Sequence, residues 1–233
     1  MPFAAGGVTF LLAAAGFWYL VDFLSPRGPS AAPTIQVNLE QQQELARKAL
    51  LSGDYAEAVR HLEPLRGAQQ GTPRQRRRSA QLERQAALLN DWPREPLAQV
   101  LGRTARLNDD EFQAVTGRHR GKAAVFDVVV RRDASRQYWV KPMGPGGLVT
   151  LNLDLQDVKL LSHLPLDGPQ RLVFAGRIAD LRRTGADSCT VRLDPDTAVL
   201  LTDVTAAGLG NLIADATLAP ILTQQAQWVE ELP

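Results

Sequence analysis

The first hydrophobic run of the chain extends from Phe3 to Leu24 and contains one charged residue, Asp22. A helix of this length covers roughly 33 Å, which matches the ~30 Å hydrocarbon core of a bilayer. Aromatic residues 17–19 are near its end, where amphipathic rings favour the membrane interface. The pattern therefore predicts a single-pass transmembrane anchor over residues 1–24, with membrane lipid as its partner.

Two other interpretations of this run are open. A cleaved signal peptide would have its site near residues 30–32, although no basic residue precedes the apolar run. A buried helix of a soluble domain would need apolar neighbours around its whole circumference. Only Arg27 follows within twenty residues, so the charge bias leaves the membrane side of the folded part undetermined. Three prolines in residues 25–37 predict a stiff, extended spacer.

From Asn38 to residue 107 the apolar positions follow a helical period. The first helix is expected to end at Ser52-Gly53. Asp54, with Glu57 three residues later, predicts a capping box that starts a second helix. A third helix over residues 79–90 and a short fourth one near residues 97–107 complete this region, whose simplest interpretation is a small helical bundle.

The segment from Leu45 to Ala58, LARKALLSGDYAEA, resembles the middle of a tetratricopeptide repeat. The resemblance covers about residues 38–65, and it implies two antiparallel helices joined by the Gly-Asp-Tyr turn and a surface that binds protein partners. A single copy departs from the family, because one repeat cannot bury its own apolar face.

Five arginines without an intervening acid form the one basic cluster of the chain: Arg66, Arg74, Arg76, Arg77 and Arg78. Gly67, Gly71 and Pro73 predict a loop here. Residues Arg74, Arg76, Arg77 and Arg78 would then reach outward to lipid headgroups or nucleic-acid phosphates. The alternatives are a solvated loop and neutralisation within the fold by nearby glutamates.

After residue 108 the pattern changes from helical to alternating. Asn108 and Glu111 predict a capped helix that ends near Gly117. Strands are then expected over residues 121–132, 137–141, 148–153, 170–182 and 188–193, with a short helix or crossover at 156–164 and further β pattern to residue 203. Gly176, in the middle of the longest strand, predicts a bend or a close backbone approach.

Five or six strands, a crossover after the third and a long bent strand resemble an OB-fold barrel. The segments GKAAVFDV at 121–128 and RLVFAGRI at 171–178 resemble the first and fourth strands of tRNA-anticodon-type OB domains found in many bacterial proteins. The resemblance covers about residues 117–204, and a different small antiparallel barrel would give the same alternation. The expected fold class is α+β, with the barrel and its leading helix over residues 108–204.

An OB-fold can bind oligonucleotides or oligosaccharides on its second and third strands. On the second strand, Gln137, Trp139 and Lys141 share one face and form a possible ligand surface, in which Trp139 would stack on a base. Tyr138 and Val140 form the opposite face, and either set can be the buried one. The other interpretation places Trp139 in the core or against a helix.

The chain ends in residues 205–233, where apolar positions from Asp215 onward predict an amphipathic helix. The expected face consists of Leu218, Ile221, Leu222, Trp228, Val229 and Leu232. Pro220 is expected in its first turn, where a missing amide hydrogen costs nothing.

Composition narrows the possible functions. The chain has 26 basic and 25 acidic residues and a formal charge of +1, which excludes a generally polybasic protein. Residues 117–204 carry 13 basic and 10 acidic groups, so nucleic-acid binding by the barrel is possible but not favoured. One cysteine, Cys189, excludes an internal disulfide or a multi-cysteine metal site, and it is expected to be a buried structural residue.

The sequence lacks the common catalytic motifs, including HExxH, the phosphate loop and GxSxG. We therefore expect no enzyme and no cofactor. The favoured hypothesis is a membrane-anchored scaffold or subunit that binds protein partners at the bilayer. The alternative is a nucleic-acid or polyanion-binding protein that uses the OB-like barrel and the Arg74–Arg78 loop.

Overall fold

The computed structural model describes residues 38–67, 71–95, 97–104, 107–135, 137–143, 150–185, 187–210 and 212–231. The predicted anchor and spacer, residues 1–37, lie outside this part of the chain. No helix among the described residues has the length and apolar character that a bilayer crossing requires.

Two short helices open the described part of the chain. Asn38 accepts a hydrogen bond from the Gln41 amide (3.1 Å) and caps α2, Leu39–Ser52. Gly53 ends this helix with a φ of 78°, a conformation that glycine adopts without strain. Asp54 then accepts from the Glu57 amide and starts α3, Tyr55–Leu62, which continues as the 3-10 helix η1, Glu63–Leu65. The predicted helix pair is confirmed. The predicted capping box is only half formed, because the Asp54 amide donates to the Ala49 carbonyl (2.9 Å) and the Glu57 carboxylate contacts Arg60 and His61.

The third helix, α4, spans Pro73–Asp91 and begins six residues before the predicted position. Its start is a reciprocal cap, in which the Thr72 hydroxyl accepts from the Gln75 amide (3.2 Å) and the Gln75 side chain accepts from the Thr72 amide (2.8 Å). Pro73 occupies the first helical position, where its fixed φ suits a helix. The predicted Arg74–Arg78 loop is therefore wrong, and these arginines lie on the first turns of α4.

Two further helices precede the sheet: α5, Leu97–Thr104, and α6, Asp109–Gly117. The capping box of Asn108 and Glu111 is confirmed, with both of its hydrogen bonds present at 2.9 and 3.1 Å. Leu97, Leu101 and Phe112 pack into the core of the barrel-like sheet, so both helices belong structurally to the sheet.

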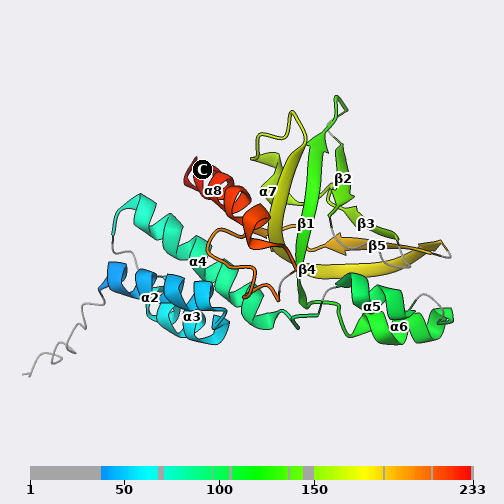
Figure 1. Cartoon of the computed structure of the whole chain (residues 1–233), viewed down its shortest axis with the longest axis horizontal. Helices are drawn as coiled ribbons and strands as arrows, with labels where there is room; N and C mark the ends of the chain where they lie inside the picture. Colours follow the sequence, from blue (N-terminus) through cyan, green and yellow to red (C-terminus); the bar gives the residue numbers. More distant parts are fainter. Residues whose placement is uncertain are drawn as a thin grey trace, which may run out of the picture. The chain divides into compact units, whose positions relative to one another are not determined.

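A mixed sheet curls into a nearly closed barrel beside these helices (Figure 1). Its strands are β1, Ala123–Arg132; β2, Tyr138–Pro142; β3, Thr150–Asp154; β4, Gln170–Gly185; β5, Ser188–Leu193; and β6, Val199–Leu200. The strand order is β2-β1-β4-β5-β3, and β6 pairs with β4. Between β2 and β3, the Gln156 side chain exchanges two 3.4 Å hydrogen bonds with the Tyr138 backbone. The α+β class is confirmed.

The expectation of a purely antiparallel barrel is wrong for one strand pair. β3 runs parallel to β5, with Leu151 opposite Cys189 and Leu153 opposite Val191. A parallel neighbour requires a long connection, which here consists of the short helix α7, Lys159–Ser162, and the whole of β4. An alternating sequence pattern does not distinguish the two directions, because both place every second side chain on one face.

The long strand β4 belongs to both halves of the sheet. Its first half pairs with β1 up to Arg177, and its second half pairs with β5 from Ile178 onward, with a register shift between Ile178 and Asp180. At Gly176 a Cβ atom would stand 3.3 Å from Leu193 Cδ1, so this glycine allows the close approach that the sequence indicated.

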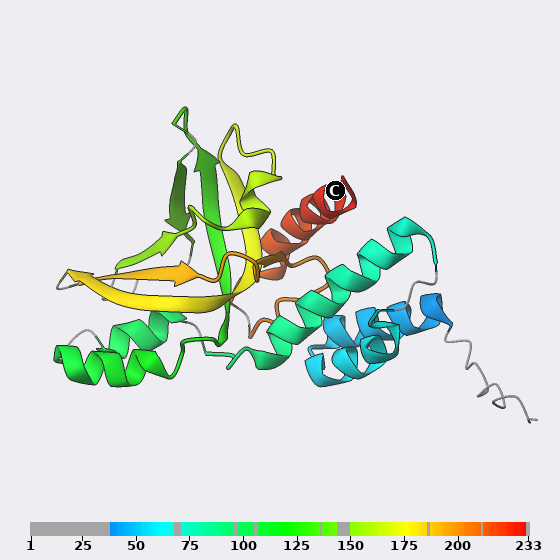
Figure 2. The same ribbon diagram turned by 180° about the vertical axis from the view of Figure 1, so that it is seen from behind.

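β1 and the first half of β4 are buried on both faces. Inside the barrel, the Phe126 and Phe174 rings stack with centroids 5.3 Å apart, and Val128 and Val130 lie on the same face as predicted. On the outside, alternate residues such as Val125 and Val173 pack in a second core with helices α2–α4. Figure 2 shows these helices on the side of the sheet away from β2. Residues 37–233 therefore form one compact unit.

The segment that follows β6 is held between the helices and the sheet by polar contacts. Gln81 donates to the Leu200 carbonyl (2.8 Å), and Gln85 accepts from the Thr202 amide (2.8 Å). The Tyr55 hydroxyl donates to the Gly208 carbonyl (2.7 Å), and burial raises the pKa of this phenol. The apolar face of the helix pair is thus covered by this segment and by the sheet.

The final helix, α8, spans Asp215–Glu231, and Leu218 and Ile221 are buried as predicted. Pro220 is its sixth residue, so the predicted first-turn position is wrong. The most buried side chain of the described helix is the polar Gln225, which is fully enclosed. Leu232 lies outside the described residues.

Candidate functional site

A groove of about 1,270 Å³ runs between α2, α4 and α8. α4 lies along it, with α2 on one side and α8 on the other. Residues from α4 and α2 supply most of its charged lining, and α8 supplies most of its apolar lining. The groove lies within the helical face of the 37–233 unit and contains no residue of β2.

Three of the four arginines predicted from the sequence meet in this groove. Arg74, Arg77 and Arg78 lie on one face of α4 because their spacing of three and four residues matches the helical period. Arg76 is not part of the lining, and its guanidinium donates to the Gly71 carbonyl (2.8 Å). The capped start of α4 therefore positions the cluster.

The lining of the groove is balanced in charge. It contains four arginines and four carboxylates: Arg47, Arg74, Arg77, Arg78, Glu40, Glu44, Asp203 and Glu230. Arg47 donates to Asp203 (2.8 Å), and Arg74 donates to Glu230 (2.5 Å) across the groove from α4 to α8. The structure thus pairs Arg74 of the sequence cluster with a carboxylate that is distant in the chain.

The α8 side of the groove presents an apolar stripe. Leu222, Ala226 and Val229 follow each other at spacings of four and three residues, so they share one helix face. Leu82 on α4 adds to this surface at the bottom of the groove. Leu222 and Val229 are only partly buried, and Ala226 is exposed. The groove therefore combines an accessible apolar stripe on its α8 side with charged residues that lie mostly on its α4 and α2 sides.

In the second predicted set, Trp139 and Lys141 lie exposed on the outer face of β2, and Gln137 is exposed directly before the strand. Tyr138 and Val140 pack against the barrel core, which settles the face that the sequence left open. The interpretation of Trp139 as a core residue is wrong, because 49% of its surface is exposed. The Arg131 guanidinium, from the neighbouring strand β1, lies 5.9 Å from the centre of its ring. This surface and the groove are separate sites.

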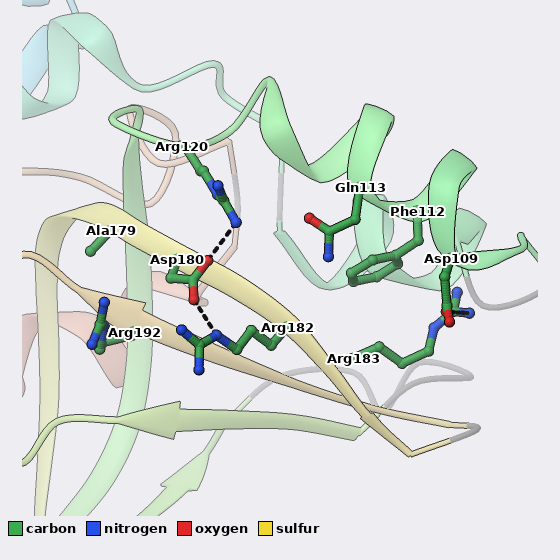
Figure 3. Close-up of a pocket in the computed structure, with 9 residues that line it drawn as sticks. All are labelled: Asp109, Phe112, Gln113, Arg120, Ala179, Asp180, Arg182, Arg183 and Arg192. Atoms are coloured by element: carbon green, nitrogen blue, oxygen red, sulfur yellow. Dashed lines mark hydrogen bonds and ion pairs between the residues drawn. The ribbon is translucent and has the colours of Figure 1, made fainter.

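A third site, which the sequence did not indicate, lies between α6 and the strands β4 and β5 (Figure 3). This pocket of about 630 Å³ contains four arginines and two aspartates: Arg120, Arg182, Arg183, Arg192, Asp109 and Asp180. We call it the arginine pocket. In the sequence these arginines are scattered over more than seventy residues, and the pairing of β4 with β1 on one side and with β5 on the other brings them together.

Asp180 is the carboxylate that pairs with two arginines of the arginine pocket. One carboxylate oxygen accepts from Arg120 Nη2 (2.7 Å) and the other from Arg182 Nε (Figure 3). Burial alone would raise the pKa of Asp180, but the hydrogen bond from Arg182 and the charges of Arg182 and Arg120 hold it below its usual range. The carboxylate is therefore ionised at neutral pH.

Arg183 has a structural role in the same pocket. It donates to the backbone carbonyls of Thr104 and Leu107 (both 3.0 Å) and pairs with Asp109 (3.1 Å). Its guanidinium also lies 4.6 Å from the centre of the Phe112 ring. These contacts fasten α5 and α6 to β4.

Cys189 is the only thiol of the chain and lies buried on the inner face of β5, as expected. Burial raises its pKa, against a small opposing effect of Arg183, so the thiol is protonated at neutral pH. It is a poor nucleophile in this position.

Comparisons with known protein families, with curated proteins and with solved structures find no match to this chain.

Proposed function

We propose that this protein is a membrane-tethered, non-catalytic scaffold that holds an amphipathic helix of a partner protein in the groove between α2, α4 and α8. The observation that carries the proposal is the lining of the groove, which joins an accessible apolar stripe to a balanced set of charges. A polyanion would favour a surplus of positive charge, whereas a protein helix matches a surface of both signs.

The dimensions of the groove support a protein segment as its occupant. Its volume of about 1,270 Å³ exceeds the approximately 300–1,000 Å³ of typical small-molecule clefts. Leu222, Ala226 and Val229 repeat at helical spacing, and a helix that packs beside them would present its own apolar residues at the same spacing. The two helices would then bury a shared apolar seam.

The charges on the two sides specify the flanks of that helix. Glu40 and Glu44 line the α2 side, so the flank that faces α2 is basic. Arg77 and Arg78 line the α4 surface, so the part of the segment that faces α4 is acidic. The expected partner segment therefore carries an apolar stripe that faces α8, an acidic edge that faces α4 and a basic edge that faces α2, and this arrangement fixes its orientation in the groove.

We also propose that residues 3–24 form the membrane tether and that residues 25–37 separate it from the folded part. The supporting observations are the 22-residue apolar run and the three prolines that follow it. The Gly53-Asp54 turn between α2 and α3 supports the tetratricopeptide-like assignment. The bent β4 and the crossover through α7 support the OB-like assignment.

A second candidate function is binding of single-stranded nucleic acid on the outer face of β2. The specific observation in its favour is Trp139, which is half exposed beside Arg131 and the exposed Lys141. Aromatic rings flanked by cations serve as stacking platforms for bases in such proteins. This face shares no residue with the lining of the groove, so variants at the two surfaces distinguish the two functions.

The test compares two variants of the full-length chain purified from its native membrane. Ala226→Glu places a charge in the middle of the apolar stripe at an exposed position, so it leaves the fold intact. We expect it to weaken co-purification of the partner by about tenfold or more, as loss of a central interface contact does. Trp139→Ala is the matched control and should leave co-purification unchanged.

Quantitative mass spectrometry of the co-purified material gives the readout. The proposal requires that the protein lost with Ala226→Glu contains an amphipathic helix with the stated basic and acidic edges. The reverse pattern, in which Trp139→Ala removes bound nucleic acid and Ala226→Glu changes nothing, would replace the scaffold with the second candidate function.

A further inference from the structure

We propose that the arginine pocket binds a phosphate monoester or another dianionic phosphate group through Arg120, Arg182 and Arg192. The site is separate from the groove and from the β2 face, and nothing in the proposed scaffold function requires it. The observation behind it is that three arginines line one open pocket around Asp180, whose carboxylate pairs with only two of them, Arg120 and Arg182 (Figure 3).

The hydrogen bonds to Asp180 leave most of the donors in the pocket available. Each guanidinium carries five N–H groups. Asp180 takes Nη2 of Arg120 and Nε of Arg182, so the terminal nitrogens of Arg182 and the remaining nitrogens of Arg120 can bind another oxyanion. Phosphate oxygens match the planar fork of a guanidinium, which binds them in pairs.

Arg192 adds a third cation next to this pair. It lies directly opposite Asp180 in the register of β4 and β5, and both side chains are on the outer face of the sheet. Among the residues that the structure describes, no carboxylate forms an ion pair with Arg192. Asp154 is its neighbour on β3, and that carboxylate accepts from the Gln156 amide (3.3 Å).

The charge balance favours a dianion. Arg183 is matched by Asp109, and Asp180 neutralises one of the other three arginines. The lining therefore keeps a surplus of two positive charges in an open pocket of about 630 Å³. A phosphate monoester carries nearly two negative charges at neutral pH, which a carboxylate does not.

The pocket offers contacts to a phosphate group but no accessible aromatic ring for the rest of a ligand. Its one aromatic residue, Phe112, is buried beneath the Arg183 guanidinium, so it is not accessible for stacking on a base. Recognition would therefore depend on the phosphate group, and that group can belong to a soluble phosphate monoester or to a phosphatidic acid headgroup. Both present the same dianionic chemistry to the pocket.

The experiment titrates inorganic phosphate into the full-length chain in phosphatidylcholine nanodiscs and follows phosphorus-31 NMR line broadening. Chloride keeps the ionic strength constant, because screening weakens exposed charge pairs. We expect saturable millimolar binding that Arg192→Gln weakens about threefold to tenfold. The matched control is Arg84→Gln, which removes an exposed arginine of α4 that lines none of the three sites and should not alter binding.

A second series identifies the source of the phosphate. If the group belongs to a lipid, phosphatidic acid in the nanodisc competes and weakens binding of inorganic phosphate to the unaltered chain but not to Arg192→Gln. If the group is soluble, phosphatidic acid has no effect. The proposal is overturned if inorganic phosphate does not bind, if Arg84→Gln weakens binding as much as Arg192→Gln, or if only a single-stranded oligonucleotide shows Arg192-dependent binding.

Discussion

Replacing Asp127 with alanine is expected to lower the free energy of unfolding by about 3 kcal/mol. Asp127 lies on β1 with only 5% of its side chain exposed, and its two oxygens accept from Arg171 Nε (2.8 Å) and Nη2 (2.6 Å). The Asp127→Ala variant leaves the Arg171 guanidinium without this partner on a largely covered face of the sheet. Urea unfolding of the full-length chain in detergent, followed by circular dichroism, measures the loss.

A double variant tests whether the loss of stability comes from leaving the Arg171 charge unpaired. Asp127→Leu combined with Arg171→Met removes both charges and keeps the volume, so it should cost clearly less than Asp127→Ala alone. The hydrogen bond to Asp127 also raises the pKa of Arg171, so the guanidinium is charged at every accessible pH. A double variant that is as unstable as the single one would show that the cost does not come from an unpaired charge.

The second large effect is expected at Gln225, whose amide completes the hydrogen bonding of the sheet. Its oxygen accepts from the Val173 amide (2.7 Å), and its nitrogen donates to the carbonyls of Val173 (2.9 Å) and Leu201 (2.6 Å). Gln225→Ala leaves a buried N–H and a buried carbonyl without partners. Because each such group costs about 1–3 kcal/mol, the free energy of unfolding should fall by about 2–4 kcal/mol.

Gln225→Glu is the matched control for this prediction, because it keeps the size of the side chain and loses only the amide donor. An ionised carboxylate would face two carbonyl oxygens in a buried site, so this variant should be at least as unstable as Gln225→Ala at pH 7. It should recover part of its stability below about pH 5, where a protonated carboxyl group can donate. The same denaturation series gives both results. Equal stability of Gln225→Glu and the unaltered chain at pH 7 would contradict the assigned bonds.

Local signals in the sequence predicted most of the elements. Asn108 and Glu111 form the expected capping box, and the alternation around Phe126 indicates the correct inner face of β1. The start of α4 is an exception although its signal is local, because Gly71 and Pro73 also favour a loop. Thr72 and Gln75 are spaced as a capping box, and a proline directly after the cap favours a helix.

The three candidate sites depend on contacts between residues that are far apart in the sequence, and a local sequence pattern does not contain this information. Glu230 pairs with Arg74 from 156 residues away, and this distance in sequence hides the ion pair from any local pattern. Strand alternation gives two faces for β2, and only packing against the barrel shows that Trp139 is the outer one. In the same way, the arginine pocket exists because the register of β4 and β5 places Arg192 opposite Asp180.

Site-specific photo-crosslinking in intact membranes tests the scaffold proposal most directly. A photoreactive residue at Gln227 faces the groove, and the same residue at Gln224, on another face of α8, is the control. We predict an adduct from position 227 alone, in the membrane pellet after carbonate extraction, mapped to an amphipathic helix of one partner protein. Release of the full-length chain into the supernatant, or equal adducts from both positions, would contradict the proposed tether and groove.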